Sequence, residues 1–168
     1  TAPDKRSGRG LKKTTSPVKN ISKELNYTIY QPFDLKDPDF LFMLNKIDAD
    51  IFVVVAYKIL PEELIIIPRN GAVNLHASLL PKYRGAAPIQ RAILNGETKT
   101  GVTTFQIHPK VDTGDVLLQG TYKMNRNITM GEVYYKLSHI GADLIVTTLN
   151  KFNNKQLVPI KQNHNKAT

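Results

Sequence analysis

The chain contains no cysteine, so the sequence offers no disulfide framework, no thiolate metal ligand and no thiol nucleophile. Its longest apolar run, 51–57, falls far short of the roughly 20 residues that a membrane-spanning helix needs. No glycine-rich loop of either standard phosphate-binding spacing is present, which gives a nucleotide cofactor little support. We therefore expect a soluble protein of the cytoplasm, with an organelle matrix as the alternative.

The 168 residues suit one globular domain, and the 41% hydrophobic share is typical of a folded chain. The formal net charge is +9, and basic residues are concentrated near the start, where only Asp4 and Glu24 oppose them. These basic residues are Lys5, Arg6, Arg9, Lys12, Lys13, Lys19 and Lys23. The cluster favours a polyanionic partner, and the alternative is a solvated lysine-rich surface. Gly8 and Gly10 predict a flexible loop that can follow a phosphate backbone.

Start signals and apolar periodicity divide the remaining chain into alternating helices and strands. Helices are predicted over 17–25, 38–47, 61–68, 87–94 and 129–151, and strands over 27–30, 51–56, 71–76, 101–107 and 116–123. This alternation predicts an α/β class with a largely parallel sheet flanked by helices. The continuously apolar run 51–56 is typical of a strand buried on both faces. Residues 158–168 are polar and unpatterned, and we expect a linker there.

Three polar side chains are candidates for a reactive site. Asn74 and His76 end a predicted strand, and residues two apart on a strand project to the same face. In open α/β sheets, ligands bind outside the carboxyl ends of strands, which is where His76 is expected. Asp112 opens the segment Asp112-Thr113-Gly114-Asp115 after a later strand and supplies a carboxylate. An amide, an imidazole and a carboxylate that meet in one cleft can transfer an acyl group.

Each of the three groups has a role in acyl transfer to an amine. The Asn74 amide can donate a hydrogen bond to the oxyanion that develops on the attacked carbonyl. His76 can donate when protonated or can move a proton, because imidazole titrates near neutrality. Asp112 would favour the imidazolium and could hold a water or the amine. This chemistry requires no metal and no covalent nucleophile.

Taken singly, these signals have structural alternatives. A histidine after a strand is more often a structural residue, and the segment 112–115 is typical of a turn. Two carboxylates without further oxygen ligands give no cation site. Ser78 does not lie in a Gly-x-Ser-x-Gly elbow and is not expected to be a nucleophile. His108, His139 and His164 receive no role.

In combination the motifs are specific. Asn74-Leu75-His76, the segment 78–93, Thr100-Gly101-Val102-Thr103 and 112–115 follow one another in an order that resembles methionyl-tRNA formyltransferases. The basic segment 3–19 resembles the loop by which those enzymes grip the acceptor stem of initiator tRNA. The related glycinamide ribonucleotide formyltransferases share the Asn-x-His and Asp elements but lack that loop.

The resemblance implies a Rossmann-like formyltransferase fold and an activity in translation initiation. A formyl group would pass from 10-formyltetrahydrofolate, a co-substrate, to the α-amino group of methionine on initiator tRNA. Asn74, His76 and Asp112 would be the catalytic residues, and no metal is implied. The folate contacts implied by the family are Tyr57, Ile59, Leu60, Ser78, Leu79, Leu80 and Pro81. The implied tRNA contacts are Lys5, Arg6, Arg9, Lys12 and Lys13, with Arg84 as a second anionic contact.

The resemblance also sets the expected domain limits. Residues 1–157 would form the catalytic domain, including the basic loop 1–19 but lacking the family's first strand-helix unit. Residues 158–168 would begin the linker to a β-barrel domain that these 168 residues do not contain. Lys58 directly follows Tyr57, where the family has a glycine. We expect a monomer without membrane contact. The alternatives are a folate-dependent formyltransferase acting on a small amine and an inactive remnant that binds tRNA or folate.

Overall fold

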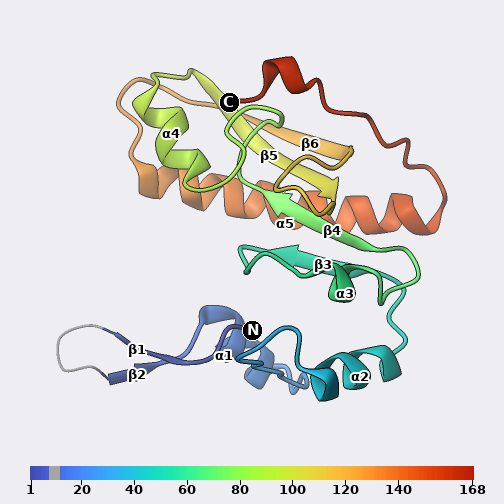
Figure 1. The fold of residues 1–168 in the computed structure, drawn as a ribbon. Coiled ribbons are helices and arrows are strands. Elements are labelled where there is room, and N and C mark those ends of the chain that lie inside the picture. Colours follow the sequence, from blue (N-terminus) through green and yellow to red (C-terminus); the bar gives the residue numbers. More distant parts are fainter. Residues whose placement is uncertain (8–11) are drawn as a thin grey trace.

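A four-stranded sheet forms the centre of the molecule in the computed structural model, which describes residues 1–7 and 12–168 (Figure 1). In spatial order the strands are β3 (Phe52–Val55), β4 (Ala72–His76), β5 (Lys99–Gln106) and β6 (Val116–Lys123). β3 and β4 are parallel, whereas β4 with β5 and β5 with β6 are antiparallel. The α/β class is confirmed, but the sheet is mixed and not largely parallel. The short connection 107–115 cannot hold the crossover that a parallel neighbour of β5 would require.

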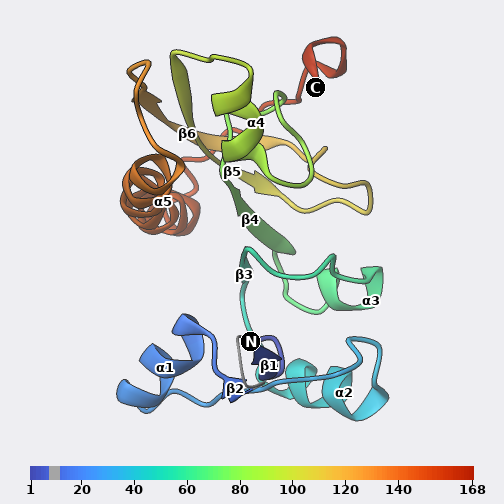
Figure 2. The same ribbon diagram turned by 90° about the vertical axis from the view of Figure 1, so that its left-hand side faces the viewer.

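The long helix α5 (Met130–Asn153) lies along β5 and β6 and contacts α4 (Pro88–Leu94). Figure 2 shows α5, seen nearly along its axis, on one side of the sheet. The helix begins at a reciprocal capping box, in which the Thr129 side chain accepts from the Glu132 backbone and the Glu132 carboxylate accepts from the Thr129 backbone. The core between these elements includes Ile89, Val102, Val133 and Leu137. Burial of these apolar side chains holds the helices on the sheet.

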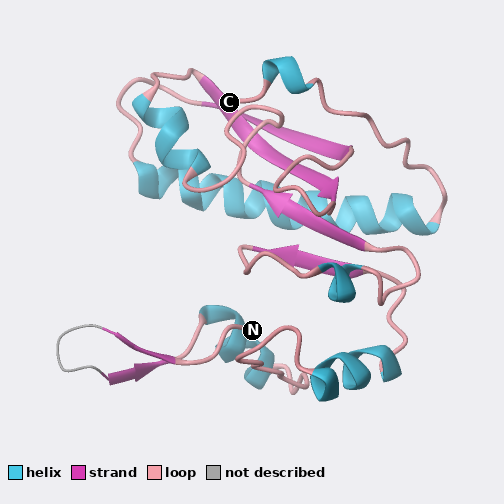
Figure 3. Cartoon of the chain, in the orientation of Figure 1, coloured by secondary structure: helices cyan, strands magenta, loops and turns pink. Residues whose placement is uncertain are grey.

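The first half of the chain contributes a group of small elements beside β3. They are β1 (Lys5–Ser7), β2 (Lys12–Thr14), α1 (Pro17–Glu24), α2 (Pro38–Lys46) and, after β3, α3 (Glu62–Ile65). The Ser16 and Asp37 side chains cap α1 and α2, as their positions before proline predict. The strand predicted over 27–30 is wrong, because this stretch is irregular chain with no strand beside it among the described residues (Figure 3).

β3 differs from its prediction in burial. The exposed fractions of Val53 and Val55 are 41% and 53%, so the strand is not buried on both faces. β3 is an edge strand of the described sheet, and exposure alternates along it. A continuous apolar run therefore identified the strand without identifying its place in the sheet.

The segment predicted as a linker packs against the domain over 160–168. Ile160 and Val116 exchange backbone hydrogen bonds of 2.9 and 2.8 Å. A short 3₁₀ helix, η1 (His164–Lys166), follows, and Thr168 accepts a hydrogen bond of 3.0 Å from the Arg84 backbone. The segment therefore passes close to the loop that follows β4. Within the described residues, no helix has the length and apolar character needed to span a bilayer.

Candidate active site

A cavity of about 530 Å³ opens where β3 and β4 end. Asn74 and His76 of β4 line it, and Asp112 reaches it from the loop between β5 and β6. The loop 56–60 after β3 supplies another wall. The structure thus brings the three predicted polar side chains to one cavity. The cavity lies at the carboxyl ends of the parallel strands β3 and β4, which is where ligand sites are expected in α/β sheets.

His76 is buried and held at both ring nitrogens. Its Nε2 lies 2.8 Å from the carbonyl oxygen of Tyr83, and its Nδ1 lies 3.6 Å from Oδ2 of Asp112. A carbonyl oxygen can only accept, so this contact assigns the hydrogen to Nε2. Nδ1 is therefore the nitrogen that faces the carboxylate and can gain or lose a proton.

The Asp112 carboxylate is fixed by the loop after β4. Its Oδ2 accepts a hydrogen bond of 2.7 Å from the Gly85 backbone, and its side chain is 12% exposed. Asp112 itself has φ +51°, a left-handed conformation that is unfavourable for a non-glycine residue. Two residues later, a Cβ on Gly114 would lie 1.7 Å from the Gln106 carbonyl oxygen. Only glycine fits there, so close backbone packing determines the path of the turn.

Asn74 is half-buried, and no hydrogen bond joins its amide to another residue that the structure describes. Its backbone pairs with Val54 on one side and Phe105 on the other, which fixes its direction within the sheet. A half-buried amide at a cavity wall is free to donate to a ligand.

The predicted folate contacts divide into two groups. Tyr57, Ile59 and Leu60 line the cavity. Burial raises the pKa of the Tyr57 phenol above its ordinary value, so the hydroxyl stays protonated at neutral pH. Neighbouring Ala56 has φ +48°, a left-handed conformation that turns the chain as it leaves β3.

The segment 78–81 forms the second group, and none of Ser78, Leu79, Leu80 and Pro81 lines this cavity. Ser78 is fully buried, and its hydroxyl donates to the Lys82 carbonyl at 2.6 Å. Thr103 Oγ1 donates to the Ser78 carbonyl at 2.7 Å and accepts from the Leu80 backbone at 3.1 Å. The segment therefore braces the loop from inside, because the Ser78 hydroxyl, the Ser78 carbonyl and the Leu80 amide are already paired within the protein.

Arg84 is occupied within the protein. Its Nε and Nη2 lie 3.1 and 2.7 Å from Oε1 of Gln162, and Nη2 lies 3.0 Å from Nδ1 of His164. A second anionic contact at Arg84, expected from the sequence, would have to compete with these partners. Arg84 therefore acts first as an internal connection between the loop after β4 and the C-terminal segment.

Sequence reasoning missed several groups around the cavity. His108, to which no role was given, lines it. The Tyr83 carbonyl contacts His76, and the Gly85 amide donates to Asp112. Tyr83 and Gly85 both have positive φ. Every residue has a backbone carbonyl, and nearly every residue has a backbone amide, so the sequence does not show which of them will contact a side chain. Only the glycine at position 85 indicates an unusual backbone conformation. Gln162 had no signal either, because it lies in a polar stretch without periodicity.

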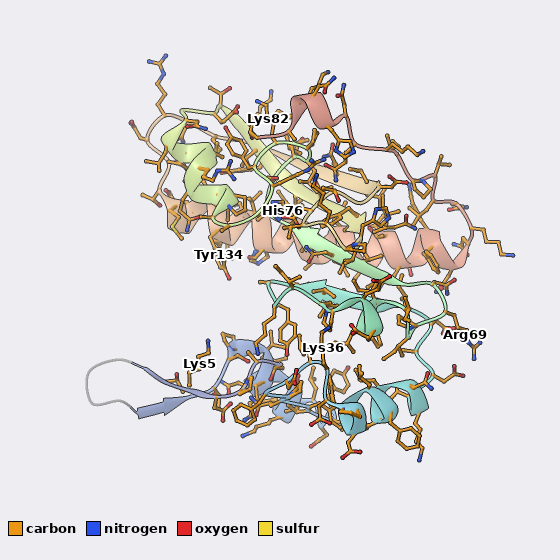
Figure 4. All side chains as sticks on the ribbon, viewed as in Figure 1. Lys5, Lys36, Arg69, His76, Lys82 and Tyr134 are labelled. Carbon is orange, nitrogen blue, oxygen red and sulfur yellow. The ribbon has the colours of Figure 1, made fainter. Side chains whose placement is uncertain are left out.

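Four of the predicted tRNA contacts, Lys5, Arg6, Lys12 and Lys13, lie in the two-stranded ribbon of β1 and β2. Lys5 is exposed, and Figure 4 shows it well away from His76. Arg6 pairs with Lys13 in the ribbon register, and Lys12 pairs with Ser7, while Arg9 lies outside the described residues.

Lys19 behaves differently from the other basic residues near the start. Its Nζ lies 2.8 Å from both oxygens of Asp4 and also contacts Gln31 Oε1, and its side chain is 12% exposed. Lys19 therefore anchors the base of the ribbon and is not a surface cation. Among the described residues, no group of three histidine or acidic side chains could hold a metal ion.

Comparison with known proteins agrees with this geometry. A family model described as "Formyl transferase" matches residues 1–149. A methionyl-tRNA formyltransferase of Clostridium novyi is 47% identical over 99% of this chain and 55% of its own length. A second relative of that description, from Clostridioides difficile, is 45% identical over 98% of this chain and 53% of its own. The chain thus spans about half the length of the curated relatives it matches.

Solved structures support the fold. The phosphoribosylglycinamide formyltransferase of Bacillus halodurans superimposes with a TM-score of 0.74 at 22% identity, over 83% of this chain and 76% of that one. This similarity shows the fold alone. Since the family model covers most of the residues, including all three polar side chains at the cavity, the chain belongs to the formyl transferase family.

Proposed function

We propose that this chain is the catalytic domain of a methionyl-tRNA formyltransferase. The reaction would move a formyl group from 10-formyltetrahydrofolate to the α-amino group of methionine on initiator tRNA, during translation initiation. The observation that carries the proposal is His76, which is held between the Tyr83 carbonyl and Asp112 in a cavity that Asn74 also lines. The names of the Clostridium and Clostridioides relatives support the choice of substrate.

The cavity suits a folate as formyl donor. Its volume, about 530 Å³, lies within the range usual for small-molecule sites, and Ile59 and Leu60 provide apolar walls for a flat ring. The Tyr57 hydroxyl, which remains protonated, can donate or accept one hydrogen bond there. Since 78–81 braces the loop from inside, we assign the folate contacts to Tyr57, Ile59 and Leu60.

In the proposed step the amine nitrogen attacks the formyl carbon, and the bond from that carbon to the donor nitrogen breaks. Negative charge develops on the formyl oxygen in between. The Asn74 amide is free to donate to that oxygen, because no described residue uses it. Removing one oxyanion donor typically lowers the rate about a hundredfold to a thousandfold.

The proton lost by the amine must reach the leaving nitrogen of the donor. His76 Nδ1 is the atom that can carry it, because Nε2 already donates to the Tyr83 carbonyl. In the imidazolium form, Nδ1 also donates, and the Asp112 carboxylate 3.6 Å away stabilises the charge. The Gly85 amide keeps that carboxylate in place through the transfer.

The acceptor tRNA would bind along the ribbon of β1 and β2. We assign the phosphate contacts to Lys5, Arg6, Arg9, Lys12 and Lys13. The ion pair between Lys19 and Asp4 fixes the start of the ribbon and so its direction. We also propose that the protein acts in the cytoplasm as a monomer.

The competing function is formyl transfer to a small amine. It is favoured by a structural neighbour, the N-formyltransferase of Helicobacter canadensis in complex with folinic acid and dTDP-3-aminofucose, at 27% identity and a TM-score of 0.59 over 66% of this chain and 40% of that one. The basic ribbon argues against a small-amine substrate, because such a substrate would leave the five basic residues assigned to tRNA without a binding partner.

Formylation assays with the complete protein separate these functions. Charged initiator tRNA, a dTDP-amino sugar and glycinamide ribonucleotide are offered in turn with 10-formyltetrahydrofolate. We expect formylation of the tRNA alone. Turnover only on a small amine would overturn the proposal, and folate or tRNA binding without any turnover would support the remnant that only binds.

A further inference from the structure

Gln162 is the most buried residue of the C-terminal segment and connects two loops of the cavity. It is 7% exposed, and every hydrogen-bonding group of its amide is used. Its Nε2 donates to the carbonyl oxygens of Asp112 and Gly114 at 3.0 and 2.7 Å. Its Oε1 accepts from Nε and Nη2 of Arg84 at 3.1 and 2.7 Å. A single side chain thus joins the turn 112–114 to the loop after β4.

Both connections act on the same carboxylate. The turn carries Asp112, which has φ +51° and needs surrounding structure to keep an unfavourable conformation. The loop carries Gly85, whose backbone donates to Oδ2 of Asp112 from the position next to Arg84. Gln162 therefore holds the backbone of the turn that carries Asp112. Through Arg84 it also holds the loop whose Gly85 amide donates to the Asp112 carboxylate.

We propose that Gln162 is a positioning residue that sets the distance between Asp112 and His76. This inference rests on the proposed function, in which the Asp112 carboxylate stabilises the charge on His76. The gap between Nδ1 and Oδ2 is 3.6 Å, so a small displacement of the turn would remove the contact. Misplacement of a reacting group by about 1 Å can cost about a hundredfold in rate.

The first test is Gln162→Met in the complete protein, which keeps the side-chain length and removes its hydrogen bonds. We expect kcat for formylation of charged initiator tRNA to fall about tenfold to a hundredfold. KM for tRNA and for 10-formyltetrahydrofolate should stay within about twofold, because Gln162 does not line the cavity. Asn165→Ala, an exposed change on the same segment, is the matched control and should leave kcat unchanged.

The decisive test repeats Gln162→Met in an Asp112→Asn background. If Gln162 acts through Asp112, removing the charge first should reduce its effect on kcat to less than about twofold. An equal loss in both backgrounds would overturn the inference, as would a wild-type kcat for Gln162→Met when Asp112→Asn is impaired. An Asp112→Asn enzyme with a wild-type rate contradicts the proposed function itself, and the Gln162 inference falls with it.

A second variant covers the case in which Gln162→Met does not fold. Gln162→Glu keeps an acceptor for Arg84 but turns the donor into an oxygen that faces two carbonyl oxygens. We expect kcat to fall at least as far as it does with methionine. The affinity for folinic acid, measured by fluorescence titration, should not change. Wild-type kcat for this variant would overturn the inference.

Discussion

The cavity around His76 and the ribbon of β1 and β2 present their functional residues in opposite ways. His76 and Asp112 are nearly buried, and backbone groups or each other hold their polar atoms. On the ribbon, Lys5 stands exposed, and order comes from the paired Lys19 and Asp4 at its base. The protein thus fixes the directions of His76 and Asp112 in the cavity, whereas Lys5 is exposed on a ribbon that is anchored at its base.

The difference matches what the two proposed tasks require. Stabilising a developing charge needs dipoles already in place in a site without bulk water, because reorganising them would add to the barrier. Binding a nucleic-acid backbone needs positive charge near phosphates, and flexible lysines and arginines provide it. The affinity they give depends strongly on salt concentration, because binding releases counterions. Changes in the cavity should therefore lower kcat, and changes in the ribbon should weaken tRNA binding.

The largest effect is expected from His76→Ala. Removing the imidazole to which we assign the proton transfer should lower kcat by about a hundredfold to ten-thousandfold. Steady-state formylation of charged initiator tRNA measures it, and tRNA affinity should not change. His139→Ala, an exposed histidine of α5 away from the cavity, should be close to wild type. A His76→Ala rate within threefold of wild type would reject the role given to the imidazole.

Gly114→Ala should have the next largest effect. Its new Cβ would lie 1.7 Å from the Gln106 carbonyl oxygen, so the turn that carries Asp112 must shift. We expect kcat to fall about tenfold or more and the free energy of unfolding to fall by about 1–3 kcal/mol. Both are measured on the purified variant, by formylation and by urea unfolding.

Gly131→Ala is the control for that change, since nothing lies within 4 Å of its added Cβ and it lies in the first turn of α5. Its stability should stay within about 0.5 kcal/mol of wild type. If Gly114→Ala were equally neutral, close packing of the turn would not be what places Asp112.

The ribbon gives a smaller effect of another kind. Lys5→Ala should weaken tRNA binding and lower the slope of log K against log salt concentration by about 1, as expected for one lost phosphate contact. Filter binding at several salt concentrations measures the slope, and Lys136→Ala on α5 is the exposed control. An unchanged slope for Lys5→Ala would remove that residue from the interface.

The smallest effect concerns pH. Hydrogen bonds from Lys82 and Tyr83 hold the pKa of the Glu97 carboxyl below its ordinary value. A depressed pKa stabilises the fold above the ordinary value, and this contribution is lost as pH falls through the lower folded-state pKa. Solvent screening limits it, so Glu97→Gln should cost less than about 1 kcal/mol at pH 7 and nothing near pH 3, by thermal unfolding. A cost that grows as the pH falls would contradict this sign.

Features that depend on residues close in sequence were predicted correctly. Features that depend on residues far apart in the chain were not. Ser16, Asp37 and Thr129 cap the helices predicted to begin beside them, because capping joins residues only two or three positions apart. The β3 run predicted a strand but not its edge position, which depends on which strands lie beside it. The face of β4 was predictable from alternation, which is why Asn74 and His76 were found together.

The groups that hold these side chains were beyond sequence reasoning. Gln162 donates to the carbonyl of Asp112, 50 positions earlier in the chain. The polar, unpatterned sequence around Gln162 does not predict such a contact. At Ser78 the family resemblance implies a folate contact, and only the structure shows that its hydroxyl donates to the Lys82 carbonyl. Residue type predicts the chemistry a group can perform, but tertiary packing decides which groups are still available to perform it.

The separation of the two regions is tested most directly by single-turnover formylation of charged initiator tRNA by the complete protein, measured across tRNA concentrations. His76→Ala and a ribbon variant with Lys5, Lys12 and Lys13 all changed to Ala are compared with wild type. We predict that His76→Ala lowers the rate at saturating tRNA and leaves the half-saturating concentration unchanged, while the ribbon variant does the reverse. A ribbon variant that is slow at saturation, or a His76→Ala enzyme that binds tRNA weakly, would contradict the account.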